Sequence, residues 1–348
     1  MTEPLISLDN ISRHFVRPLD AAEKVANLFG AGLKEQVVRA VDSVTLSIAE
    51  GEVVGLVGES GCGKSTLGRV VAGILPPSAG TVRFQGREVS RLRRAERRAA
   101  DLAVQMVFQD PMASLNPRRR VVEILGEAPV VHGLVKPAEV EAYVAAMMAR
   151  VGLDPATRQR YPHQFSGGQR ARIGIARALA VKPKVLVCDE STAALDVSIQ
   201  AQVLNLFMDL RRDFGLTYLF VSHDLGVVEH ISDRVAVMYL GRIVELSPTE
   251  ELFGAPNHPY TQALLDEVPR LEPKKKRFSA LKGEIPSPLH PPSGCHFHPR
   301  CPLAFDRCRV DRPALKAIAP GRFSACHLND GDMPRPGKAV QDGAVLAR

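Results

Sequence analysis

Short apolar runs alternate with longer amphipathic stretches through most of the chain. Residues 53–57, 185–188 and 217–221 are continuous apolar runs with the length and β-branching of buried strands. Between 197 and 214, apolar residues recur at steps of four, three, one, three and four, which places them on one face of a helix. The alternation predicts an α/β fold with a mainly parallel sheet and helices on both faces. The expected strands are 5–11, 38–48, 53–57, 81–84, 103–108, 185–188, 217–221 and 234–239.

Helical spacing outside these strands predicts the layers that cover the sheet. We expect helices over 67–75, over 90–98 and from residue 168 onwards. Residues 121–151 alternate apolar and charged positions at helical spacing, although glycine and proline interrupt them. They predict a helical subdomain over about 110–166.

Two parts of the chain depart from this pattern. The segment 16–36 mixes helix formers with glycines and is an insertion whose role the sequence does not show. After about residue 256, proline and glycine become frequent and the periodicity fades. We therefore divide the chain into a main domain, 1–255, and an appended C-terminal extension, 256–348, which is expected to be held by something other than a large core.

Composition narrows the class of protein. An apolar share of 45% in 348 residues is ample for a globular core. The chain has no run of about 18 uncharged apolar residues and no signal pattern near residue 1, which predicts a cytosolic protein. The net charge of +7 is scattered, with short basic clusters at 91–98, 118–120 and 274–277. We interpret these clusters as solvated faces or surfaces near anionic lipid, and expect no nucleic-acid partner.

The stretch from Gly58 to Thr66 fits the pattern G-x-x-x-x-G-K-[ST] at every required position. It follows an apolar strand and precedes a helical pattern, which favours a phosphate-binding loop over an ordinary glycine-rich turn. The glycines allow backbone N–H groups to surround phosphate oxygens, while Lys64 can reach the β- and γ-phosphates and Ser65 can bind Mg²⁺. The predicted nucleotide-binding residues of the loop are Gly58, Ser60, Gly61, Cys62, Gly63, Lys64, Ser65 and Thr66.

An acidic pair follows the apolar strand 185–188. Such a pair is most often a helix cap when it stands alone. Combined with a phosphate-binding loop it indicates a nucleotide hydrolase, because the strand would deliver both carboxylates to the sheet edge beside the phosphates. Asp189 would hold Mg²⁺ directly or through water, and Glu190 would polarise the attacking water.

A second glycine-rich segment, Phe165-Ser166-Gly167-Gly168-Gln169-Arg170, precedes the helix expected near residue 168. In isolation it could be a flexible turn. In this position it resembles the signature of ATP-binding-cassette (ABC) ATPases, with Phe165 where many members have Leu. Ser191 and Ala193 also stand where the family commonly has Pro and Ser. The resemblance implies a P-loop ABC nucleotide-binding domain, with an antiparallel β subdomain, that binds ATP and Mg²⁺.

In that family two nucleotide-binding domains pair head to tail, and each signature closes over the γ-phosphate that its partner binds. The resemblance therefore assigns Ser166, Gly167, Gly168 and Gln169 to a partner's nucleotide. A hydroxyl, two glycine N–H groups and a helix N-terminus suit that phosphate. We accordingly expect the chain alone to hydrolyse ATP poorly.

Four further positions match the family in chain order. Phe15 resembles the aromatic residue that stacks on adenine, although an aromatic residue near a strand end is also common in a core. Gln109 resembles the glutamine that meets Mg²⁺ and water. Asp196 resembles the loop that communicates across the dimer. His223 resembles the switch histidine that contacts the γ-phosphate, although a lone histidine after a strand is usually a satisfied polar group.

A narrower resemblance is to the ATPase subunits of bacterial dipeptide and oligopeptide importers. Phe165 and the proline-rich approach to Cys295 resemble the second, F-type ATPase of such systems. The resemblance implies a heterodimer with a second ABC ATPase beneath two transmembrane permeases, peripheral at the cytoplasmic face of the inner membrane. A substrate-binding protein would deliver the peptide. The segments that carry the resemblance are 107–111, 114–118, 160–164, 257–261 and 283–288.

Two kinds of alternative stay open at this point. Related importers carry nickel, glutathione or a peptide antibiotic, because substrate choice lies in other subunits. A soluble cassette ATPase that acts on DNA or ribosomes is the alternative from another class. Such proteins usually carry two cassettes or a long inserted coiled coil, and this sequence shows neither.

Four of the six cysteines lie in the C-terminal extension, at Cys295, Cys301, Cys308 and Cys326. Their intervals match neither a C-x₂-C zinc pair nor the common ferredoxin patterns, so the chemistry leaves zinc and iron–sulfur open. The peptide-importer family, which Gly294-Cys295-His296-Phe297 resembles, has members with a four-iron cluster on four cysteines. The resemblance implies a [4Fe–4S] cluster that staples the extension, with four unliganded thiols as the alternative.

Overall fold

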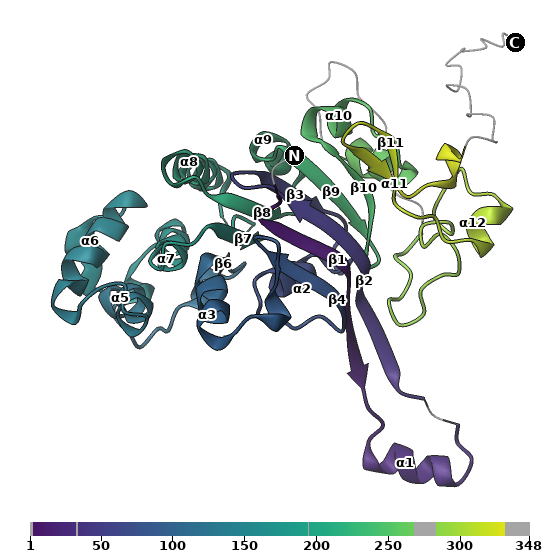
Figure 1. The fold of residues 1–348 in the computed structure, drawn as a ribbon, viewed down its shortest axis with the longest axis horizontal. Helices are drawn as coiled ribbons and strands as arrows, with labels where there is room; N and C mark the ends of the chain where they lie inside the picture. The colour runs from purple at the N-terminus through teal and green to yellow at the C-terminus, as the bar shows by residue number, and fades with distance from the viewer. Residues whose placement is uncertain (1–2, 33, 194, 268–282, 331–348) are drawn as a thin grey trace, which may run out of the picture.

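The centre of the fold is an eight-stranded sheet (Figure 1). The computed structural model describes residues 3–32, 34–193, 195–267 and 283–330. Five neighbouring strands are parallel, and three antiparallel strands extend the sheet beyond β9. In sheet order the strands are β6 (Val104–Val107), β7 (Val185–Asp189), β8 (Thr217–Val221), β3 (Val53–Val57), β9 (Arg234–Tyr239), β10 (Arg242–Pro248), β12 (Arg322–Ser324) and β11 (Lys316–Ala319).

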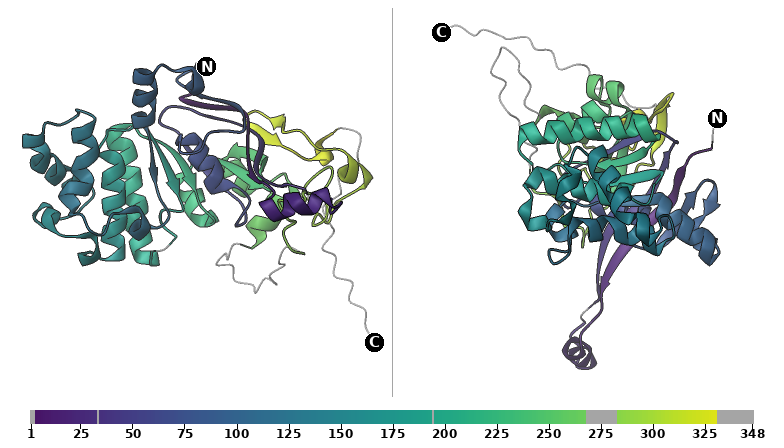
Figure 2. Two further views of the ribbon diagram at one scale, coloured as in Figure 1. Left: turned by 90° about the horizontal axis from the view of Figure 1, so that it is seen from below. Right: turned by 90° about the vertical axis from the view of Figure 1, so that its left-hand side faces the viewer.

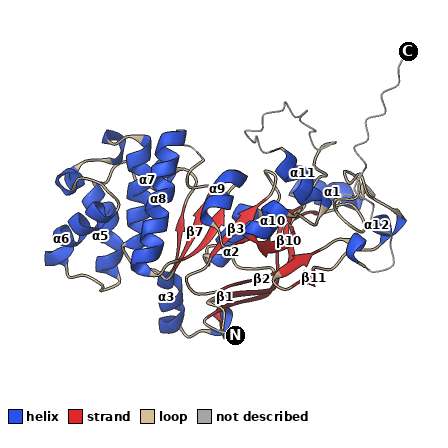
Figure 3. Ribbon diagram, turned by 90° about the horizontal axis from the view of Figure 1, so that it is seen from above, coloured by secondary structure: helices blue, strands red, loops and turns tan. Residues whose placement is uncertain are grey.

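The sheet separates two hydrophobic cores. In β3, Val53 and Val57 belong to one core while Val54 and Leu56 belong to the other, because successive side chains of a strand point to opposite faces. Helices cover both faces (Figure 3), which confirms the predicted α/β class. The first core includes side chains of α7 (Gly167–Leu179), α8 (Val197–Phe214) and α9 (Leu225–Ile231), and the second core includes side chains of α2 (Lys64–Val71).

A four-stranded antiparallel sheet packs on the second core. Its two long strands continue as an arm that carries α1 (Ala21–Leu28) at its tip, as Figure 1 and Figure 2 show. The Asp20 carboxylate caps this helix by accepting from the Glu23 N–H at 2.7 Å. The insertion at 16–36 is therefore a structured arm, residue 33 aside. The strands are β2 (Gln36–Ile48), β1 (Ile6–Arg17), β4 (Ala79–Phe84) and β5 (Arg87–Glu88).

Two predicted helices have different bounds in the structure. α2 begins at Lys64, directly after the phosphate-binding loop, and ends at Val71, because Gly73 turns the chain with a φ of 69°. The charged stretch near residue 90 forms α3 (Arg94–Ala103).

Among the described residues, no helix is both long and apolar enough to cross a membrane. The expected helical subdomain contains α4 (Pro111–Ser114), α5 (Val121–Val131) and α6 (Val140–Arg150).

The C-terminal extension shares a core with the main domain. Tyr260 and Phe297 are fully buried in the first core. The hairpin of β11 and β12, which belongs to the extension, pairs with β10 of the main domain. The main sheet therefore includes strands from both sides of the boundary predicted at residue 255. The division into two domains stays a prediction. The composition of the extension predicts little hydrophobic core. In the structure, aromatic side chains of the extension are instead buried in the core of the main domain. The basic cluster at 274–277 lies outside the described residues. The helices of the extension are α11 (Pro259–Asp266) and α12 (Asp306–Val310), and α10 (Thr249–Gly254) directly precedes it.

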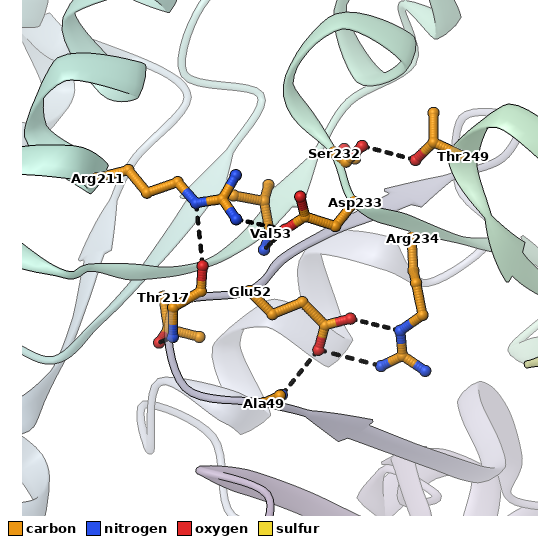
Figure 4. A network of polar contacts seen from close by, with 10 residues as sticks. Ala49, Glu52, Val53, Arg211, Thr217, Ser232, Asp233, Arg234 and Thr249 are labelled. Atoms are coloured by element: carbon orange, nitrogen blue, oxygen red, sulfur yellow. Dashed lines mark hydrogen bonds and ion pairs between the residues drawn. The ribbon is translucent and has the colours of Figure 1, made fainter.

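A polar network fixes the start of β3, the strand that leads into the phosphate-binding loop (Figure 4). The Asp233 carboxylate accepts from the Val53 N–H at 2.8 Å and from Arg211 at 2.6 Å. The Glu52 carboxylate pairs with Arg234 of β9. Since both carboxylates are satisfied, the N-terminal end of β3 is held firmly against its neighbours.

Candidate active site

The loop between β3 and α2 is shaped by glycines in left-handed conformations. Gly58, Gly61 and Gly63 have φ values of 150°, 79° and 107°. A Cβ on Gly63 would lie 2.0 Å from the carbonyl oxygen of Ala40, and one on Gly58 would lie 2.2 Å from that of Met238. Glycine is therefore required at both positions, because neighbouring backbone leaves no room for a side chain.

Lys64 is the buried cation of this loop, with 4% of its surface exposed. Its Nζ donates to the carbonyl oxygens of Gly58 at 2.7 Å and Glu59 at 3.0 Å. A cavity of about 250 Å³ lies along the loop. A buried ammonium group and the N-terminus of α2 suit that cavity to a polyphosphate. The cavity is lined by residues 60–66 with Val38, Arg39, Ala40, Gln109, Glu190, Leu240, Gly241 and Pro288.

Ser65 and Asp189, the predicted Mg²⁺ ligands, are adjacent. The Ser65 hydroxyl donates to Asp189 Oδ1 at 2.7 Å. Burial raises the pKa of Asp189, which stands 2% exposed at the end of β7. A divalent cation would stabilise the ionised form of this carboxylate, and hydroxyl and carboxylate oxygens are ligands that Mg²⁺ accepts. The donor set therefore fits one Mg²⁺ ion.

Gln109, Glu190 and His223 meet at the carboxyl ends of β6, β7 and β8, which are neighbours in the sheet. Gln109 Nε2 donates to Glu190 Oε2 at 2.8 Å, and His223 Nδ1 lies 3.5 Å from the same oxygen. Glu190 has a φ of 46°, and its N–H donates to the Val221 carbonyl oxygen at 3.0 Å. The strand order thus gathers the three predicted catalytic residues around a carboxylate that can take a proton from water.

Phe15 lies near the same cavity but on the antiparallel sheet. In β1 it pairs with Val38, which lines the cavity. Its ring is 40% exposed, and the guanidinium carbon of Arg13 lies 4.9 Å from the ring centroid. This exposure argues against the core alternative and leaves the ring available to stack on a base.

The signature residues lie apart from the loop cavity, since none of 166–169 lines it. The Ser166 N–H donates to Gln169 Oε1 at 2.9 Å, and the Gln169 N–H donates to Ser166 Oγ at 3.3 Å, which forms a capping box for α7. A Cβ on Gly168 would lie 2.6 Å from the Ile199 side chain, whereas one on Gly167 would meet nothing within 4 Å. Gly167 therefore faces open space.

Asp196 directly precedes α8, the helix on which the signature packs. It is the N-cap residue, but its side chain makes no capping hydrogen bond. The next residue, Val197, is 83% exposed. The contact between Gly168 and Ile199 links this helix start to the signature. The signature and the loop that the family resemblance links to communication across the dimer therefore lie next to each other.

The four thiols of the C-terminal extension line one small cavity. Burial and the neighbouring thiols raise the pKa of Cys301 to about 11 and that of Cys326 to about 12. Within the described ranges, however, no three His, Cys, Asp or Glu side chains are arranged to hold a metal ion. The structure gathers the four cysteines predicted as ligands but gives no support to the metal itself.

Three contacts around the loop were not predicted from the sequence. Pro288 of the extension lines the loop cavity, and Tyr260 and Arg300 both bond to Glu59 of the loop. The available signal was the resemblance of 257–261 and 283–288 to peptide importers, but that resemblance specified no contact.

Two family descriptions match the chain. "ABC transporter" matches residues 41–193, and "Oligopeptide/dipeptide transporter, C-terminal region" matches residues 244–308. The probable peptide ABC transporter ATP-binding protein y4tS of Sinorhizobium fredii is 47% identical over 329 residues, which cover 94% of this chain and 91% of that protein. This chain belongs to the ABC transporter ATP-binding proteins. It is an ATP hydrolase coupled to transport, as the resemblance to importer ATPases predicted.

Further relatives and solved structures agree with this assignment. The oligopeptide transport ATP-binding protein AppF of Bacillus subtilis is 52% identical over 296 residues, covering 84% of this chain and 90% of AppF. A dimeric post-hydrolysis state of the ATP-binding cassette MJ0796, bound to ADP and Pi, has a TM-score of 0.59 at 25% identity and covers 70% of this chain and 98% of that one. The structure of cbiO1 from Clostridium perfringens also has a TM-score of 0.59 at 25% identity, and the match covers 73% of this chain and 92% of cbiO1.

As an ABC transporter ATPase, the chain dimerises and works with transmembrane permease subunits. ATP with Mg²⁺ is the expected ligand of its nucleotide site. The residues around the phosphate-binding loop fit that ligand in charge and donor chemistry, and their individual roles are proposals.

Proposed function

We propose that this ATPase energises the uptake of dipeptides and oligopeptides across the cytoplasmic membrane. The observation that carries the proposal is the C-terminal region, which matches that of oligopeptide/dipeptide transporters and bonds directly to the phosphate-binding loop. The descriptions of y4tS and AppF, which name peptide and oligopeptide transport, support it.

ATP would favour a closed pair of cassettes. One cassette would bind the triphosphate through Lys64, Ser65 and Asp189 would hold Mg²⁺, and the signature of the second cassette would close over the γ-phosphate. Because both cassettes contact each nucleotide, ATP binds the closed pair more tightly than the open one and shifts the population toward it. Hydrolysis removes that preference, and the pair reopens.

Glu190 is the proposed general base of the hydrolysis. It takes a proton from the attacking water as the water oxygen bonds to the γ-phosphorus and the bond to ADP breaks. Gln109, which donates to Glu190 Oε2 at 2.8 Å, holds the carboxylate and meets the water. His223 would contact the γ-phosphate from the end of β8.

The proposed assembly is a heterodimer with a second ABC ATPase beneath two permeases, peripheral at the cytoplasmic face of the inner membrane. A substrate-binding protein delivers the peptide to the permeases. Val131 and Leu134, at the end of α5, are 66% and 41% exposed and offer an apolar surface to a permease. Phe165, the departure that resembles the F-type subunit, is buried in the first core.

Growth and uptake by a deletion strain test the substrate. A leucine auxotroph that lacks this ATPase should not grow on tri-leucine but should grow normally on free leucine. The wild-type protein should restore growth and uptake of labelled tri-leucine, whereas Glu190→Gln should not. Normal peptide uptake with loss of nickel, glutathione or antibiotic uptake would instead assign one of those substrates.

Co-purification separates transport from the soluble alternative. Protein captured from detergent-solubilised membranes should carry two permeases and a second ATPase. Recovery with ribosomes or DNA, and without permeases, would favour a soluble ABC ATPase of the other class.

We also propose that the four thiols of the extension hold a [4Fe–4S] cluster, which would supply a covalent staple for this region. Four cysteines facing one cavity are the donor set of such a cluster. Backbone N–H groups directed at three of the sulfurs stabilise their thiolates, and a cationic iron core would offset the raised thiol pKa values. The N–H donors are Phe297 and His298 for Cys295, Leu303 for Cys301, and Leu328 for Cys326.

Metal analysis decides among the three states of this cavity. Protein purified without oxygen should be brown and contain about four irons per chain. Cys301→Ser should lower the iron content, whereas Cys188→Ser, at a buried position in β7, should not. Colourless protein with stoichiometric zinc would replace the cluster by zinc, and protein free of both metals would leave four thiols.

A further inference from the structure

Glu59, the second residue of the phosphate-binding loop, is held from two sides by the C-terminal region. Its carboxylate receives two parallel hydrogen bonds from Arg300, Nη1 to Oε2 at 2.7 Å and Nη2 to Oε1 at 2.9 Å. Its backbone N–H donates to the Tyr260 hydroxyl at 2.9 Å. The two matched family regions, 41–193 and 244–308, are thereby joined at the loop.

The Arg300–Glu59 contact is largely buried and lies beside packed aromatic rings. The Arg300 side chain is 5% exposed and that of Glu59 is 21% exposed. The ring centroid of Tyr239 lies 4.7 Å from that of Tyr260 and 5.3 Å from that of Phe297. The guanidinium carbon of Arg300 lies 5.9 Å from the Tyr239 centroid. A bidentate pair enclosed in this way has one geometry, unlike an exposed ion pair, which contributes little.

Glu59 also touches the groups that bind nucleotide. Its carbonyl oxygen accepts from Lys64 Nζ at 3.0 Å and from the Cys62 N–H at 3.3 Å. A shift of Glu59 would therefore displace the buried ammonium group and a loop amide together. An unpaired carboxylate in the loop would in addition repel the phosphates of ATP.

We propose that Arg300 and Tyr260 are positioning residues for ATP binding, and that both act on the nucleotide through Glu59. Arg300 neutralises the Glu59 carboxylate and fixes its direction, while Tyr260 fixes the backbone of the same residue. The segment 257–261 thereby gains a function at the nucleotide site. The C-terminal extension completes the ATP-binding site of its own chain.

The affinity of full-length protein for a fluorescent ATP analogue, mant-ATP, tests this proposal. All variants are built on Glu190→Gln so that bound nucleotide is not hydrolysed. Arg300→Met should raise the Kd about tenfold, which corresponds to about 1.4 kcal/mol. Arg300→Lys should raise it less, because the charge remains while the bidentate geometry is lost. Tyr260→Phe should raise it about threefold, because the loop loses one hydrogen-bond acceptor.

Arg307→Met is the matched control. Arg307 lies in the same extension but pairs with Asp311 and Asp330 at 3.4 and 3.1 Å, away from the loop. Its Kd should equal that of the parent protein. Hydrogen exchange of the peptide that covers 58–66 should quicken in Arg300→Met and stay unchanged in Arg307→Met.

A double-mutant cycle separates action through Glu59 from a general loss of structure. In a Glu59→Ala background, Arg300→Met should change the Kd less than twofold, because the contact is already absent. A tenfold effect that persists in that background would overturn the proposal, as would an Arg300→Met Kd within twofold of the parent. Should thermal melting show that Arg300→Met does not fold, Tyr260→Phe decides, and an unchanged Kd there also overturns the proposal.

Discussion

The phosphate-binding loop and the signature segment are both glycine-rich turns before a helix, yet their surroundings differ. The loop is enclosed by β2, β9, the carboxylates at the end of β7 and the C-terminal extension. The signature satisfies its own hydrogen bonds through Ser166 and Gln169, and Gly167 faces open space. The first turn is complete within the chain, whereas the second presents its helix N-terminus outward. In the proposed dimer, one chain would therefore contribute two halves of different nucleotide sites.

Glu190→Gln gives the largest expected effect: ATP hydrolysis should fall while the affinity of the loop for ATP is kept. The amide keeps the shape of the side chain but cannot take a proton from water. ATP hydrolysis by the assembled transporter should fall at least about 100-fold. The Kd for ATP should stay within twofold, because Lys64 and the Ser65–Asp189 pair are untouched. Phosphate release and mant-ATP titration measure the two quantities.

Glu229→Gln is the control for that substitution, because Glu229 is an exposed carboxylate on α9 outside the loop cavity. It should leave turnover unchanged. Undiminished hydrolysis by Glu190→Gln would remove Glu190 from the role of general base.

Gly167→Ala probes the signature half of the comparison. A Cβ there meets nothing within 4 Å in this chain, so the fold should be unaffected. In the dimer the methyl group would stand between the signature and the partner's γ-phosphate. Hydrolysis by the assembled transporter should fall about tenfold or more, because small displacements of reacting groups are costly. The Kd of the isolated chain for mant-ATP should not change.

Gly174→Ala, in the same helix, is the matched control. Its Cβ also meets nothing within 4 Å, and alanine in a helix interior should stabilise the protein by about 0.5–1 kcal/mol. Equal ATPase losses in Gly174→Ala and Gly167→Ala would show that the effect comes from α7 and not from a partner's phosphate.

The helices and strands that could be predicted are those whose own apolar pattern reveals which residues are buried. The helix at 197–214 and the strands at 217–221 and 234–239 were predicted with the observed bounds, because their apolar patterns reflect burial directly. Phe214 is an exception within that helix. It is 44% exposed, and the guanidinium carbon of Arg150 lies 5.0 Å from its ring centroid.

Elements that depend on distant partners could not be predicted. β10 carries Glu245, which is fully buried because it accepts from the N–H groups of Asn257 and His258. β11 and β12 are short and need the edge of β10. The nucleotide site likewise contains residues that could be predicted from the sequence and a contact that could not. Residues after the parallel strands converge by topology, whereas the contact of Arg300 with Glu59 spans 241 positions and has no local pattern.

Phe15→Ala gives the smallest expected effect. It tests whether the nucleotide site at the phosphate-binding loop contacts the adenine base of ATP as well as its phosphates. Stacking of a base on an aromatic ring contributes about 1–3 kcal/mol, and a ring that is 40% exposed should give the lower end. The Kd for mant-ATP should therefore rise about fivefold. Phe29→Ala is the matched control, because Phe29 is 87% exposed beyond α1 at the far end of the same arm. Equal, unchanged affinities for the two variants would exclude Phe15 from the adenine contact and confine the loop half of the site to phosphate and Mg²⁺ binding.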